Sequence, residues 1–141
     1  MAENCSHDCG SCGEDCPSRS GASLKKQPHA MSDIKHVIAV VSGKGGVGKS
    51  MTCALLAAAS QAKGNVTAVM DADITGPSIP RMFGVHERAR GDETGILPCV
   101  SGEGVQMMSM NLLLENEDDP VVWRGALISG TVLQFWTDVI W

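Results

Sequence analysis

Residues 43–50 read Gly43-Lys44-Gly45-Gly46-Val47-Gly48-Lys49-Ser50 and match the phosphate-binding loop pattern G-x-x-x-x-G-K-[ST] at every fixed position. Glycines allow the backbone to close around phosphate groups and to direct successive N–H groups at them. Lys49 adds positive charge toward the β- and γ-phosphates, and the Ser50 hydroxyl can ligate Mg²⁺. The positive end of a following helix would add to this field. The stretch therefore predicts a phosphate-binding P-loop; the alternative is a glycine-rich turn that only links a strand to a helix.

The flanks of this loop supply the order strand, loop, helix that the motif requires. Residues 37–41 form a short β-branched apolar run, which predicts a buried parallel strand. Residues 49–63 are rich in Ala and Leu and predict a helix, with Gly64 as its C-cap. A second strand is expected at residues 65–70. This order predicts an α/β fold, a parallel-sheet P-loop NTPase with the nucleotide at the carboxyl ends of its strands.

The rest of the chain gives weaker structural signals. The expected elements are a turn-rich loop at 74–80 with a short helix to Phe83, a surface loop at 85–95, a hairpin from 96–100 and 105–110, a solvated acidic loop at 115–119, and a helix with Ile128, Val132, Phe135 and Val139 on one face. Cys53 and Cys99 fall in apolar contexts and are expected to be buried packing residues.

Composition describes an ordinary soluble globular protein, and it narrows the class of function. The chain has 141 residues, 43% of them apolar and 19% charged, which suits a domain with a real core. A net charge of −5 argues against non-specific nucleic-acid binding. No apolar run approaches the ~20 residues of a membrane span, and the N-terminus lacks the apolar core of a secretory signal. We therefore expect a cytoplasmic protein without nucleic-acid or membrane partners.

Four of the six cysteines lie within the first 16 residues, in the order C-x3-C-x2-C-x3-C, at Cys5, Cys9, Cys12 and Cys16. Cytosolic thiols stay reduced, so such a cluster indicates metal or redox chemistry. Four thiolates can hold a [4Fe–4S] cluster or a tetrahedral Zn²⁺. In a zinc site, His7 could replace one of the cysteines as a ligand. A tail with uncommitted thiols is the alternative. The expected organisation is a Cys-rich flexible segment at 1–32 and the N-terminal part of a P-loop ATPase domain at 33–141.

Two further groups could act on the nucleotide. Asp71 and Asp73 end the second predicted strand, where carboxylates can hold Mg²⁺ with Ser50 or orient the attacking water. Alternatively, one of them only caps the next turn. Lys44 is either a solvated lysine or a residue that reaches the phosphates of a second subunit, as an arginine finger does in trans.

One part of a P-loop NTPase is missing from the sequence. A P-loop NTPase needs a second acidic strand end (Walker B), an apolar strand that closes in Asp and organises Mg²⁺ and water, and the sequence supplies none beyond the strand that ends at Asp71 and Asp73. We therefore expect the chain to be the N-terminal part of a longer protein, an ATPase in its full-length form. Alone, it is expected to fold marginally or through association and to hydrolyse ATP poorly.

The residues quoted above resemble a known class. The loop with its extra Lys44 looks like the deviant Walker A loop of the MinD/ParA/nitrogenase-reductase class. Within it, residues 71–80, Ser109-Met110 and residues 122–125 resemble the Mrp/ApbC/Nbp iron–sulfur cluster carrier ATPases, and the likeness runs over 34–141. Three departures are the absence of the family's Walker B segment, the absence of its C-terminal C-x-x-C, and Ala126 where proline is usual.

The resemblance implies a homodimeric ATPase that binds a [4Fe–4S] cluster and passes it to apoproteins. Carried over by motif, residues 43–50 with Met51 bind ATP, Lys44 and Lys49 act on the phosphates, and Asp73 positions water. The alternatives are a ParA/MinD-like partition or positioning ATPase and a zinc-binding, non-catalytic nucleotide-fold module.

Overall fold

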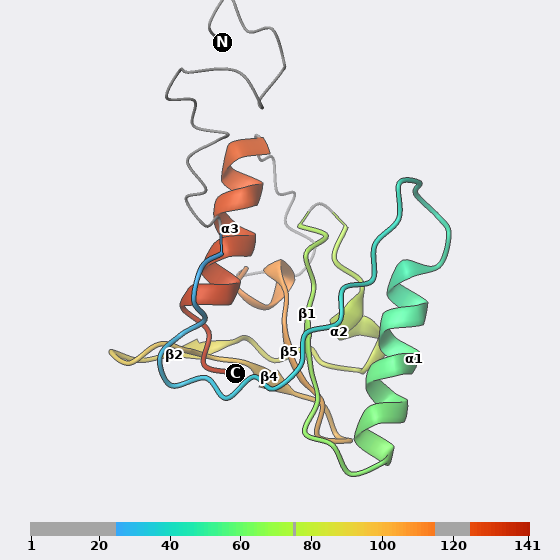
Figure 1. Ribbon diagram of the computed structural model, residues 1–141, viewed down its shortest axis with the longest axis horizontal. Helices are drawn as coiled ribbons and strands as arrows, with labels where there is room; N and C mark the ends of the chain where they lie inside the picture. The colour runs from blue at the N-terminus through green and yellow to red at the C-terminus, as the bar shows by residue number, and fades with distance from the viewer. Residues whose placement is uncertain (1–24, 75, 115–124) are drawn as a thin grey trace, which may run out of the picture.

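The computed structural model describes residues 25–74, 76–114 and 125–141 (Figure 1), with the side chains of 125–127 left out. The elements are α1 (Lys49–Ala62), β1 (Ala68–Met70), α2 (Ile79–Met82), β2 (Arg90–Gly91), β3 (Ile96–Leu97), β4 (Cys99–Val100), β5 (Gln106–Met108), the 3₁₀ helix η1 (Met110–Leu112) and α3 (Gly125–Thr137). In the described ranges, no helix has the length and apolar character needed to cross a membrane.

A mixed three-stranded sheet forms the centre, in the order β1-β5-β4. β1 and β5 pair in parallel, and β4 pairs antiparallel with β5. The predicted α/β class with parallel pairing and the hairpin between β4 and β5 are confirmed. The predicted single strand at 96–100 is wrong, because it divides into β3 and β4. β3 pairs antiparallel with β2, inside the segment predicted as a surface loop.

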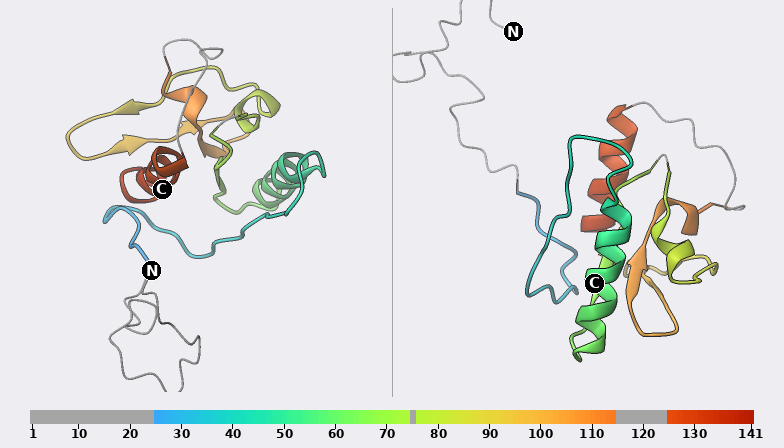
Figure 2. Two further views of the ribbon diagram at one scale, coloured as in Figure 1. Left: turned by 90° about the horizontal axis from the view of Figure 1, so that it is seen from above. Right: turned by 90° about the vertical axis from the view of Figure 1, so that its right-hand side faces the viewer.

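Residues 37–41, predicted as a buried strand, form no strand, and this prediction is wrong. Val37, Ile38 and Val41 are 69%, 80% and 83% exposed. The segment crosses one face of the molecule from α3 to α1, on the side opposite α2 (Figure 2). A strand needs a hydrogen-bonding neighbour, and no strand in the described ranges pairs with this run. The apolar pattern is therefore present without the partner that would bury it.

Two apolar clusters lie on opposite faces of the sheet. Met107 of β5 belongs to the cluster that also contains Ala57 of α1 and Ile79 of α2. Met108, the next residue, belongs to the cluster that contains Phe135 and Val139. Successive strand side chains point to opposite faces, so one strand supplies both clusters. α1 and α2 thus cover one face and α3 covers the other.

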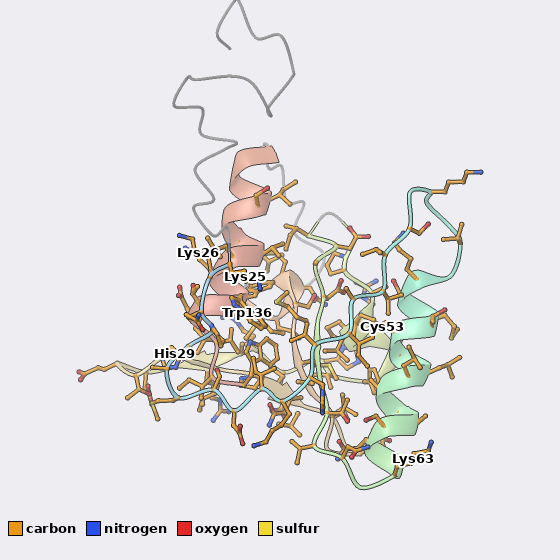
Figure 3. All side chains as sticks on the ribbon, viewed as in Figure 1. Lys25, Lys26, His29, Cys53, Lys63 and Trp136 are labelled. Carbon is orange, nitrogen blue, oxygen red and sulfur yellow. The ribbon has the colours of Figure 1, made fainter. Side chains whose placement is uncertain are left out.

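Residues 26–33 are hydrogen bonded to the C-terminal end of α3 and to Trp141. Trp136 Nε1 donates to the Lys26 carbonyl at 2.8 Å, and the His29 N–H donates to the Trp136 carbonyl at 3.3 Å. The Asp33 N–H donates to the Trp141 carbonyl at 2.9 Å. Figure 3 shows Lys26, His29 and Trp136 together beside α3. This segment is therefore hydrogen bonded both to the C-terminal end of α3 and to the residues that follow it.

Candidate functional site

The P-loop has the backbone that its glycines predict. Gly46 and Gly48 have φ values of +70° and +86°, in the left-handed region that favours glycine. Gly48 is the N-cap of α1, and its carbonyl accepts the Thr52 N–H at 2.9 Å. Because Gly48 has no side chain to cap the helix, the first N–H groups of α1 keep no side-chain partner there. The helix therefore starts at Lys49 with its positive end on the loop.

Two side chains, those of Ser42 and Lys49, make hydrogen bonds to the backbone of Lys44. Lys49 Nζ donates to the Lys44 carbonyl at 3.3 Å, so the lysine folds back over the loop. The Lys44 N–H donates to Ser42 Oγ, and that hydroxyl donates to the Lys44 carbonyl, both at 3.1 Å. The sequence did not single out Ser42, although a serine just before a glycine-rich turn is a common backbone partner. Ser42 thus fixes the peptide that carries Lys44.

The loop is open to an incoming anion. Apart from the residues adjacent in the chain, no atom of the described residues lies within 4 Å of a Cβ built on Gly43, Gly45, Gly46 or Gly48. Lys44, Val47 and Met51 are exposed, and Ser50 is half-buried in the first turn of α1. Open glycine backbone, a lysine ammonium and a helix N-terminus form a donor set that suits a polyphosphate. The predicted nucleotide residues are therefore brought together in one loop.

Asp71 is placed as the cap of the following turn. Its side chain is buried, and its Oδ1 accepts the Asp73 N–H at 3.1 Å. Its Oδ2 accepts the N–H groups of Ser78 at 3.1 Å and Ile79 at 3.3 Å, where α2 begins. Burial raises the pKa of Asp71, against the lowering effect of these hydrogen bonds. Both carboxylate oxygens are occupied by backbone donors, which is the capping role that the sequence left open.

Asp73 is the more exposed of the two carboxylates. It is exposed, and its Oδ1 accepts the Gly76 N–H at 3.1 Å. The loop after β1 and the P-loop lie at the same end of the molecule, beside the N-terminus of α1 (Figure 1). Ser50 and Asp73 therefore lie at that end of the molecule, and Asp71 caps the start of α2 that follows the loop.

The four predicted metal-ligating cysteines, Cys5, Cys9, Cys12 and Cys16, lie outside the described residues. Within the described ranges, no group of three or more His, Cys, Asp or Glu side chains could hold a metal ion.

Cys53 and Cys99 are free thiols in apolar surroundings. Cys99 is buried, as predicted, and its thiol donates to the Glu87 carbonyl at 3.3 Å. Cys53, labelled in Figure 3, is half-buried and packs against the α1 and α2 cluster. Burial and then the Asp71 charge raise the pKa of Cys53, and burial and then Glu87 raise that of Cys99. Both thiols are thus packing groups that stay protonated near neutral pH.

The chain is similar to several known proteins. The ParA family model described as "NUBPL iron-transfer P-loop NTPase" matches residues 33–141. The iron-sulfur cluster carrier protein of Methanococcus maripaludis is 42% identical over 147 residues, covering 100% of this chain and 51% of the relative. The cytosolic Fe-S cluster assembly factor CFD1 of Kluyveromyces lactis is 43% identical over 123 residues, covering 84% of this chain and 44% of the relative.

A solved structure shares the fold. It is described as a nucleotide-binding protein in complex with ADP from Archaeoglobus fulgidus, and it is 36% identical with a TM-score of 0.60. The match covers 72% of this chain and 38% of that one. The chain spans about half the length of the curated relatives that it matches most fully.

Proposed function

Because the chain belongs to the ParA family of NUBPL-type iron-transfer P-loop NTPases, we propose that it binds Mg-ATP and works as an iron–sulfur cluster carrier ATPase. The observation that carries the nucleotide part is the loop of residues 43–50. It is open, its glycine backbone is left-handed at two positions, and Lys49 Nζ already lies over it at the Lys44 carbonyl. The bound phosphates would take the place of that carbonyl as the partner of Lys49.

The roles of the site residues follow from their positions. Backbone N–H groups of the loop and Lys49 bind the β- and γ-phosphates, and Met51 contributes exposed apolar surface beside them. Ser50 and Asp73 would hold Mg²⁺, which supplies positive charge to the phosphate oxygens when bound. Asp71 keeps the loop that carries Asp73 in place through three backbone N–H groups. Asp73 is also the residue that would orient the attacking water.

Lys44 is proposed to act across a homodimer. Its N–H and carbonyl are fixed by Ser42, so the backbone is rigid while the exposed side chain extends from the loop. A lysine presented in this way can reach the phosphates of a second copy, as an arginine finger does. Mixed dimers of Lys44→Ala and Asp73→Ala subunits should regain activity that neither variant has alone.

We propose that the iron–sulfur cluster binds to Cys5, Cys9, Cys12 and Cys16. Their sequence spacing and the names of the relatives support this assignment. These thiolates suit a [4Fe–4S] cluster, to be passed to apoprotein clients, with Zn²⁺ as the competing metal. Anaerobic reconstitution of the chain should give visible sulfur-to-iron absorption with bound iron and sulfide. Changing all four cysteines to serine should remove it. A colourless protein with one equivalent of zinc would favour the zinc-binding alternative.

The nucleotide proposal is tested with two lysine variants of the same helix. Lys49→Ala removes the ammonium from the loop and should weaken Mg-ATP binding at least tenfold by calorimetry, since a charge-assisted contact contributes about 1.5–3 kcal/mol. Lys63→Ala, at the far end of α1 (Figure 3), removes an exposed lysine of equal charge and should bind as the wild type does. Equal affinity of Lys49→Ala and the wild type would refute the P-loop assignment.

A further inference from the structure

Ser109 is fully buried, and its side-chain hydroxyl has no hydrogen-bond partner among the described residues. Its side chain is 0% exposed, and that of Asn111, two residues on, is 3% exposed. Over residues 25–74, 76–114 and 128–141, the buried side-chain nitrogen and oxygen atoms that make no hydrogen bond are Ser109 Oγ and both amide atoms of Asn111. A buried polar group without a partner is costly and uncommon in native structures. The Ser109 hydroxyl is therefore a buried donor that a small change of conformation could pair.

The strand register identifies the neighbour of Ser109. Val69 lies opposite Met107 and Met70 opposite Met108 in the parallel pair β1·β5. One residue further, Asp71 lies beside Ser109, and the Asp71 N–H donates to the Met108 carbonyl at 2.9 Å, which continues the ladder. Because side chains alternate between faces, Asp71 and Ser109 project from the same face as Val69 and Met107. A buried carboxylate and a buried unpaired hydroxyl are therefore adjacent on neighbouring strands.

The two oxygens of Asp71 differ in how firmly they are held. Oδ2 accepts two N–H groups, from Ser78 and Ile79, where the chain enters α2. Among the described residues, Oδ1 accepts one N–H group, that of Asp73, at 3.1 Å. Asp73 is exposed, and the proposed function turns it toward a bound nucleotide. A rotation of the Asp73 backbone would leave Oδ1 without its donor.

We propose that Ser109 is a positioning residue for the loop that carries Asp73. When Mg-ATP draws Asp73 away, the Ser109 hydroxyl donates to Asp71 Oδ1 in place of the Asp73 N–H. The carboxylate then stays fully hydrogen bonded in both states, and the hydroxyl that is unpaired in the free chain is paired in the bound one. This inference rests on the proposed binding of Mg-ATP.

The test compares Ser109→Ala with Ser101→Ala in the whole chain. Ser101 is the matched control, because it is also buried but its Oγ accepts the Val105 N–H at 3.2 Å. Without nucleotide, Ser109→Ala should melt at the wild-type temperature or above it, whereas Ser101→Ala should melt lower. For Mg-ATP, the Kd of Ser109→Ala should rise about five- to tenfold and that of Ser101→Ala should not change. In the wild type, amide exchange at Asp73 should accelerate when Mg-ATP is added.

Each other outcome is decisive. A lower melting temperature of Ser109→Ala without nucleotide would mean that the hydroxyl is already paired in the free chain, which overturns the inference. If the wild type binds Mg-ATP and Ser109→Ala binds it equally well, the inference fails while the proposed function stands. If the wild type does not bind Mg-ATP, the proposed function fails and the inference fails with it.

Discussion

Replacing Asp71 by alanine should destabilise the fold, although the residue lies at the nucleotide end of the sheet. The carboxylate accepts three backbone N–H groups and joins the end of β1 to the start of α2. The Ile79 N–H belongs to a buried residue, and Ser78 is half-buried, so water does not fully replace the lost acceptor. The Asp73 N–H lies in an exposed loop, where water can replace it.

The size of the effect follows from these partners. A hydrogen bond to a charged group contributes about 1.5–3 kcal/mol, and two of the three would be lost without full replacement. The raised pKa of Asp71, caused first by burial, shows that holding the charged carboxylate here is itself unfavourable. Alanine removes that penalty and offsets part of the loss. We expect a net loss of about 2 kcal/mol in the free energy of unfolding, which is roughly 5–8 °C in Tm.

Asp73→Ala provides the matched comparison, since it removes a carboxylate two residues away that is exposed. Urea denaturation of the chain without nucleotide is monitored by circular dichroism. Asp73→Ala should lower the free energy of unfolding by less than about 0.5 kcal/mol, as is usual for surface positions. Equal stabilities of the two variants, or an Asp71→Ala variant as stable as the wild type, would refute the capping role.

Three further predictions concern the rest of the fold. Gly104→Ala should lower the free energy of unfolding, measured by urea denaturation, by about 1–3 kcal/mol, because φ is +89° and a Cβ would lie 2.8 Å from Gln61 Nε2. Gly102→Ala, with open space around it, should leave that free energy nearly unchanged. Phe135→Ala should lower the free energy of unfolding by about 3–5 kcal/mol, because it leaves a cavity in the core. Leu133 is exposed, so Leu133→Ala leaves no cavity and should lower it by less than about 1 kcal/mol. In a carboxyl NMR titration, the pKa of Asp92 should lie below its ordinary value, because the hydroxyl and the N–H of Thr94 donate to its carboxylate. The stability that this carboxylate adds is present above its unfolded-state pKa and is lost as the pH falls through its folded-state pKa.

Local signals in the sequence predicted the parts of the fold that depend on local physics. The P-loop, α1 and the glycine that follows it were readable because glycine conformation and helix periodicity are properties of a few adjacent residues. The run at 37–41 failed because a strand depends on a neighbour that the run itself does not specify. The strand at 96–100 failed for a different reason. Pro98 has no N–H to donate to a ladder, and the chain changes partner on either side of it.

The candidate site shows the same division. The loop and the two aspartates could be found from spacing alone. The resemblance favoured Asp73 for positioning water, but the capping role of Asp71 could not be predicted, because it depends on which backbone N–H groups fold back onto each carboxylate. Ser109 could not be recognised as part of the site, since its relation to Asp71 exists only through the register of β1 with β5.

The attachment of residues 26–33 to α3 sets the reach of the cysteines that precede it. Ten peptide units separate Cys16 from Lys26, whose carbonyl is held by Trp136, and a chain of that length extends at most about 36 Å. Any metal on these thiols is therefore confined to a sphere around the end of α3, whatever path the chain takes. A linker of this length corresponds to an effective concentration in roughly the millimolar range at the folded part of the chain. Lengthening the stretch between Cys16 and Lys26 should lower that concentration without changing a single contact of the folded part.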